Sequence, residues 1–94
     1  MTTPPTPATR MHALGDVLFQ DLEGEAVLLN LKTGVYFGLD RVGTRVWQLI
    51  ETPTPIAQIV ESLTAEFDVT DERCTADVLA LAASMAQHGL VSFE

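Results

Sequence analysis

The hydrophobic positions of this chain change their spacing near residue 40. Between residues 16 and 39, apolar side chains fall in three short runs, and turn residues separate the runs. After residue 40, apolar residues recur every three or four positions, as they do on one face of a helix. The sequence therefore predicts three strands followed by three helices.

The three predicted strands cover residues 16–21, 26–31 and 35–39. Gly24 marks the first turn, and Gly34 suits the left-handed position that closes a three-residue hairpin loop. Because both connections are short, the strands are expected to form an antiparallel meander.

The third predicted strand lies at the edge of this meander. Val35, Phe37 and Leu39 share one face, and Tyr36 lies on the other. A strand at the end of a sheet leaves backbone N–H and C=O groups unpaired. We therefore expect this strand to be the place where another extended segment can pair.

Capping residues mark the predicted helices. Asp40 is expected to cap the first helix and Thr54 the second. The third helix is expected to begin near Asp71 and to end at His88, with Gly89 in the left-handed position beyond it. The apolar stripe of the third helix is Cys74, Val78, Leu81 and Met85.

The chain of 94 residues is expected to form one domain. Residues 1–12 consist largely of Thr, Pro and Ala, which predicts a flexible N-terminal tail ahead of a domain over residues 13–94. Residues 91–93 are expected to return as a short strand. The order of elements predicts an α+β fold, a winged helix-turn-helix in which a three-stranded antiparallel meander precedes three helices.

The composition opposes a nucleic-acid partner. The sequence holds 13 acidic and 5 basic residues, which gives a formal net charge of −8 at pH 7. Phosphate binding depends on clustered lysines and arginines, and here these residues are scattered. We therefore expect no nucleic-acid partner, whereas a neutral or mildly basic peptide is easier to accommodate.

No pattern of residues predicts catalysis, a metal site or another cofactor. His12 and His88 lie in the tail and at a helix end, and neither has a metal-ligand spacing from Cys74. The position of Cys74 in an apolar stripe favours a packed core thiol. We therefore expect a protein that is not an enzyme, with no catalytic residues, no metal ligands and no cofactor.

The sequence also bears on location. The single cysteine excludes an intramolecular disulfide and fits a reducing compartment. No apolar run reaches the roughly 18 residues that a membrane span needs. No apolar region follows Arg10, as a signal peptide would require. We therefore expect a cytoplasmic protein with no membrane partner.

Residues 26–40 resemble a known family. The most specific part is Leu-Asn-x-x-Thr-Gly-x-Tyr-Phe over residues 29–37, with Val42-Gly43 and Val46-Trp47 behind it. This pattern is similar to that of PqqD-like domains, and the resemblance extends over residues 14–93, where Asp77-Val78, Leu81 and Gly89-Leu90 also fit. Such domains recognise precursor peptides in pathways that modify ribosomally made peptides. A stand-alone chain of this length resembles the leader-binding proteins of lasso peptide biosynthesis.

The resemblance implies a winged helix-turn-helix that binds the leader segment of a precursor peptide. The leader would pair with the third strand as an antiparallel strand and lie in a groove against the third helix. It would be delivered to a leader peptidase or a modifying enzyme. The peptide-binding residues implied are Val35, Tyr36, Phe37 and Gly38 on the strand, and Arg73, Asp77, Ala80, Leu81 and Ser84 on the helix.

Two other classes of function remain open from the sequence. A winged-helix DNA-binding regulator would share the fold, because a fold does not fix a function, but the third helix begins with more acidic than basic residues. A structural subunit of a modification enzyme complex, or a homodimer, would use the second face of the sheet. There the pattern is expected to place Leu18, Leu28 and Tyr36.

Overall fold

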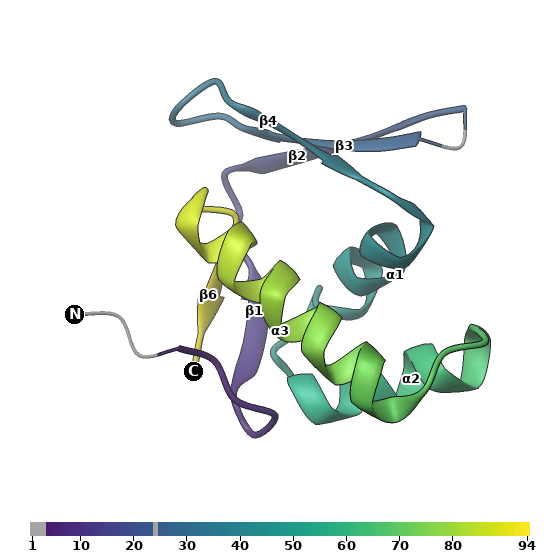
Figure 1. The fold of residues 1–94 in the computed structure, drawn as a ribbon. Helices are drawn as coiled ribbons and strands as arrows, with labels where there is room; N and C mark the ends of the chain where they lie inside the picture. The colour runs from purple at the N-terminus through teal and green to yellow at the C-terminus, as the bar shows by residue number, and fades with distance from the viewer. Residues whose placement is uncertain (1–3, 24) are drawn as a thin grey trace.

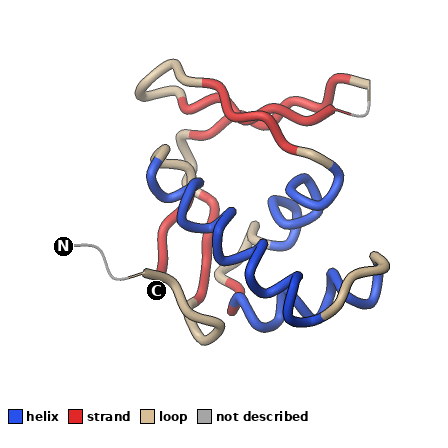
Figure 2. Tube along the Cα trace, in the orientation of Figure 1, coloured by secondary structure: helices blue, strands red, loops and turns tan. Residues whose placement is uncertain are grey.

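The computed structural model of the protein describes residues 4–23 and 25–94. Over these residues the chain forms three helices and two small antiparallel sheets, which lie as separate groups of strands (Figures 1 and 2). The elements in chain order are β1 (Arg10–Ala13), β2 (Val17–Leu22), β3 (Glu25–Asn30), β4 (Tyr36–Leu39), α1 (Arg41–Leu49), β5 (Thr54–Pro55), α2 (Ile56–Glu66), α3 (Asp71–Gln87) and β6 (Val91–Phe93).

The predicted meander is confirmed. Strands β2, β3 and β4 pair in that order, each antiparallel to the next. Gly34 has a φ of 74°, the left-handed conformation that closes the β3–β4 turn. The predicted role of Gly24 in the first turn lies outside the described residues. The expected α+β fold, with the meander as the wing and three helices after it, is thus observed.

The cross-strand register identifies the two faces of this sheet. Leu18, Leu29 and Tyr36 are neighbours across the three strands and lie on its outer face. The expectation that Leu28 belongs to this face is wrong. Leu28 pairs with Phe19 and Phe37 and is fully buried on the inner face, because successive side chains of a strand point to opposite sides.

The second sheet, in the order β5-β1-β6, corrects the prediction of a tail up to residue 12. Residues 10–12 belong to β1, where Met11 lies opposite Thr54 and Phe93 and is 0 % exposed. Burying this one large side chain favours order despite the Thr/Pro-rich composition around it. The predicted strand at residues 91–93 is confirmed as β6.

The N-terminal segment also closes the start of α2, so the predicted cap at Thr54 is wrong. The N–H groups of Ile56 and Ala57 donate to the carbonyl oxygens of Thr9 (2.9 Å) and Pro7 (2.8 Å). These bonds satisfy helix donors that a side-chain cap would otherwise serve. The hydroxyl of Thr54 instead donates to the carbonyl oxygens of Leu49 and Thr52.

The other helix ends follow the sequence closely. The Asp40 carboxylate accepts a hydrogen bond from the Gly43 N–H at 2.7 Å, as a cap of α1 should. Helix α3 begins at Asp71, with Thr70 as its cap. Gly89 follows its end with a φ of 70°, and Leu90 packs fully buried behind it. The start of α3 and its glycine stop are therefore confirmed.

One buried side chain joins the wing to α3. Asn30, the last residue of β3, is 5 % exposed. Its amide nitrogen donates to the carbonyl oxygen of His88 at 2.8 Å, and its amide oxygen accepts from the Lys32 N–H at 2.9 Å. Asn30 thus holds the β3–β4 turn and the C-terminal end of α3 together.

Candidate functional site

Strand β4 has an open edge. It is the last strand of its sheet and pairs, among the described strands, with β3 alone. The Asn30 N–H donates to the Val35 carbonyl oxygen at 3.0 Å. Hydrogen-bonded pairs alternate along antiparallel strands, so Phe37 also directs its backbone groups toward β3. The N–H and C=O groups of Tyr36 and Gly38 therefore face outward.

The side chains of β4 divide between the two faces of the sheet. Tyr36 is 65 % exposed on the outer face. Phe37 points inward, half-buried, and its ring meets the His88 ring edge-on with centroids 5.2 Å apart. Gly38 is exposed, and a Cβ added there would meet nothing within 4 Å. Val35 precedes β4 and is exposed.

The five helix residues implied by the family resemblance lie along one side of α3. Successive members are four, three, one and three positions apart, so all five fall on the same side of a helix. Arg73, Asp77 and Ala80 are exposed, whereas Leu81 and Ser84 are half-buried. The Nε of Arg73 lies 3.8 Å from a carboxylate oxygen of Asp77. Both side chains are well exposed, so this pair contributes little, roughly 0 to 1 kcal/mol.

The apolar stripe of α3 is rotated slightly from the prediction. Its buried residues are Cys74, Val78, Ala82 and Met85. Leu81, which was expected in this stripe, stays half-buried on its flank. This rotation leaves Leu81 facing a cavity instead of the packed core.

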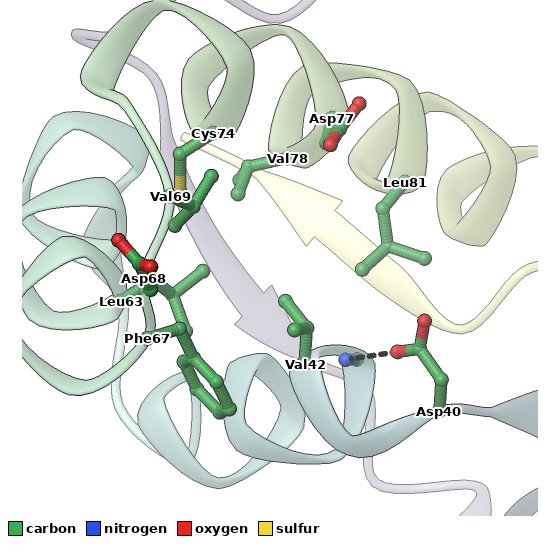
Figure 3. A pocket seen from close by; sticks show the side chains of 11 residues that line it. Asp40, Val42, Leu63, Phe67, Asp68, Val69, Cys74, Asp77, Val78 and Leu81 are labelled. Atoms are coloured by element: carbon green, nitrogen blue, oxygen red, sulfur yellow. Dashed lines mark hydrogen bonds between the residues drawn. The ribbon is translucent and has the colours of Figure 1, made fainter.

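A cavity of about 490 Å³ lies between α1, α3 and the α2–α3 connection. Figure 3 shows Val42 of α1 and Leu81 of α3 directed toward one another across it. Asp77 and Leu81 are the implied helix residues that line this cavity; Arg73, Ala80 and Ser84 do not. Its full lining is Asp40, Val42, Gly43, Leu63, Phe67, Asp68, Val69, Cys74, Asp77, Val78 and Leu81.

A second hollow, of about 330 Å³, lies at the other end of β4. Thr33 and Val35 line it from the β3–β4 turn, and Gln87 and His88 line it from the end of α3. Asp40 follows the last residue of β4 and lines the first cavity. The two hollows therefore lie at opposite ends of the open strand.

Sequence reasoning missed several residues of this site. From the sequence, Asp40 is predicted only as the cap of the first helix. His88 was treated as a helix end, although it touches Phe37 and lines the second hollow. Asn30 could have been identified from the sequence. A single amide side chain on an otherwise apolar strand face predicts a specific buried hydrogen bond.

Cys74 is a wall residue of the first cavity and is 3 % exposed. Burial, and then the nearby carboxylates of Asp77 and Asp71, raise the pKa of its thiol above the ordinary value. The thiolate is the reactive form, so a raised pKa disfavours nucleophilic chemistry at neutral pH.

We expect Cys74 in the folded protein to react with Ellman's reagent much more slowly at pH 7.5 than the same thiol in urea. The native rate should keep rising with pH beyond the ordinary thiol range, where the rate of the unfolded thiol levels off, since the folded pKa lies above that range. Absorbance at a fixed wavelength would follow both rates. A native rate equal to the unfolded one would contradict the burial of this thiol.

The described residues contain no group of three or more His, Cys, Asp or Glu side chains arranged to hold a metal ion. Within the same residues, no helix has the length and apolar character needed to cross a membrane.

The family model described as coenzyme PQQ synthesis protein D (PqqD) matches residues 25–91, from β3 to the start of β6. The chain belongs to the PqqD family. The match contains both walls of the site, β4 and α3. No curated protein matches the chain.

Two solved structures are similar to this PqqD-family chain. One is described as TbiB1 in complex with the TbiA(beta) leader peptide. It is 33 % identical, with a TM-score of 0.78, and the match covers 86 % of this chain and 94 % of that one. The other is a lasso peptide synthetase B1 complexed with the leader peptide, at 21 % identity and a TM-score of 0.77. That match covers 87 % of this chain and 96 % of the other, and it supports the fold.

Proposed function

We propose that this PqqD-family protein binds the leader segment of a ribosomally synthesised precursor peptide. The observation that carries the proposal is the open edge of β4, with hollows at both of its ends and α3 beside it. The similar TbiB1 structure, described as a complex with a leader peptide, supports it. The protein acts as a binding module and not as an enzyme.

The physical basis is strand addition. An extended leader pairs antiparallel with β4 through the outward N–H and C=O groups of Tyr36 and Gly38. Backbone hydrogen bonds tolerate many sequences, so selectivity comes from alternate side chains that reach the hollows. On the inward side, the leader is proposed to contact Phe37, Leu81 and Ser84.

Binding the leader makes the encounter of its precursor with an enzyme effectively intramolecular. An enzyme that associates with this protein then meets the precursor at a raised effective concentration. The proposed partners are a leader peptidase and a modifying enzyme in the cytoplasm. The lasso peptide pathway is favoured because the sequence resembles the stand-alone leader-binding proteins of that pathway and the fold is similar to that of a lasso peptide synthetase B1.

A second candidate function rests on the outer face of the sheet. Leu18 is 43 % exposed and lies in register with Leu29 and Tyr36, which gives an apolar strip across three strands. This strip suits a structural subunit that docks on an enzyme, or a homodimer. A DNA-binding role is disfavoured because the first turn of α3 carries Asp71 and Glu72.

The deciding experiment is a titration of a fluorescent leader peptide with this protein, followed by anisotropy. The peptide is the leader encoded by the precursor gene nearest to this one. We expect saturable binding at or below about micromolar affinity, as is common for specific peptide recognition. Unlabelled leader should compete, and a scrambled peptide should not.

The absence of binding by correctly folded protein would contradict the proposal. Folding would be checked by far-UV circular dichroism and by a cooperative urea transition. Failure to bind would favour the structural subunit, and its partner would then be sought through the outer face.

A further inference from the structure

The cavity beside Leu81 has an apolar wall and an acidic mouth. Its wall includes Val42, Val78 and Leu81. Its carboxylates come from three different places, because Asp40 follows β4, Asp68 lies in the α2–α3 connection and Asp77 lies on α3. Figure 3 shows Asp40 and Asp68 at opposite ends of the cavity, with Asp77 on the helix above it.

The nearby basic residues do not neutralise this mouth. Arg73 lies near Asp77, in an exposed pair with a separation of 3.8 Å. Arg41 is directed to the Phe67 ring, with its guanidinium carbon 5.9 Å from the ring centroid. Asp68 makes no side-chain hydrogen bond or ion pair with the described residues. Asp71 and Glu72 add further negative charge at the start of α3. The mouth therefore keeps an excess of negative charge.

The direction of β4 decides which part of a bound peptide reaches this cavity. The strand runs from Tyr36 to Leu39 and leads directly into Asp40. An added strand that is antiparallel to β4 has its N-terminal part beside Leu39 and its C-terminal part beside Tyr36. The cavity thus faces the N-terminal half of the peptide.

We propose that this cavity selects leaders that carry a lysine or arginine in their N-terminal half. The inference rests on the proposed leader binding and adds a charge preference and its position. The long stem of a lysine or arginine can lie along Val42 and Leu81 while its charged head reaches the carboxylates.

The expected preference is modest, because the carboxylates are near the surface. Replacing a basic residue in the favoured position by glutamate should weaken binding about threefold to tenfold at low salt. The difference should shrink in about 0.5 M salt, because ions screen charges that are exposed to solvent.

The test is a charge scan of the leader encoded by the nearest precursor gene. Each position is replaced in turn by lysine and by glutamate, and affinities are measured by anisotropy at low salt. The protein is compared with the triple variant D40N/D68N/D77N. Asparagine also caps helices well, so Asp40→Asn keeps the start of α1. A matched control, E25Q/E51Q/E61Q, removes the same number of exposed charges away from the cavity.

We expect a lysine preference at one or two neighbouring positions of the N-terminal half, which the cavity variant loses and the control variant keeps. Equal affinities for lysine and glutamate at every N-terminal position would overturn the inference while leaving leader binding intact. The inference would also be overturned if both variants lost the lysine preference equally, or if the lysine preference were confined to the C-terminal half of the leader. No binding of the unmodified leader would instead reject leader binding itself.

Discussion

Replacing Gly89 by alanine is expected to lower the free energy of unfolding by about 2 to 3 kcal/mol. Two costs combine at this position. The φ of 70° is unfavourable for any residue with a Cβ, and an added Cβ would lie 3.0 Å from the Asn30 amide nitrogen. That contact would displace the amide from the His88 carbonyl oxygen, which it binds at 2.8 Å. Urea denaturation followed by circular dichroism would measure the loss.

Two other glycines of the chain serve as controls. Gly34 has a φ of 74° and nothing within 4 Å of an added Cβ, so Gly34→Ala reports the cost of the backbone conformation alone. Gly15 has no positive φ and an equally open position, so Gly15→Ala should change stability by less than about 0.5 kcal/mol. If Gly89→Ala cost no more than Gly34→Ala, the link between Asn30 and the end of α3 would contribute little.

Replacing Gly38 by proline is expected to weaken leader binding at least about tenfold. Proline removes the outward N–H that is proposed to pair with the leader, and its ring occupies the space where the leader carbonyl would lie. The change is compatible with the fold, because prolines are tolerated on edge strands whose N–H groups face solvent. Anisotropy with the labelled leader would measure the effect.

Gly38→Ala is the matched control, since it adds a methyl group but keeps the N–H. A Cβ at this position meets nothing within 4 Å, so the variant should fold and bind nearly as the parent does. Phe37→Pro is less informative, because the Phe37 N–H faces β3 and its loss would disturb the sheet itself. Unchanged affinity of a folded Gly38→Pro protein would argue against pairing at this edge.

The parts of the fold that depend on local signals were predictable from the sequence. The turn at Gly34, the cap at Asp40 and the stop at Gly89 each need one residue type in one place, and the structure has all three. The open edge of β4 followed from the order of the strands. The structure places the nine implied peptide-binding residues on β4, directly before it and on α3, but their contacts with a peptide stay a prediction.

The parts that depend on distant contacts were not predictable. Strand β1 exists because Met11 pairs with residues more than 40 positions away, and its own composition gives no such signal. The rotation of α3 is set by packing, which buries Ala82 and leaves Leu81 at the cavity. Small residues such as Ala82 fit either a core or a surface, so periodicity alone could not choose between these rotations.

The Asn30 side chain has a consequence for how the site meets a peptide. Its two hydrogen bonds, both made within the protein itself, fix the β3–β4 turn to the end of α3. The strand and the helix on either side of the proposed peptide site are therefore preorganised, and binding need not order them relative to each other. Conformational entropy is lost mainly by the incoming chain, which lowers the cost of association.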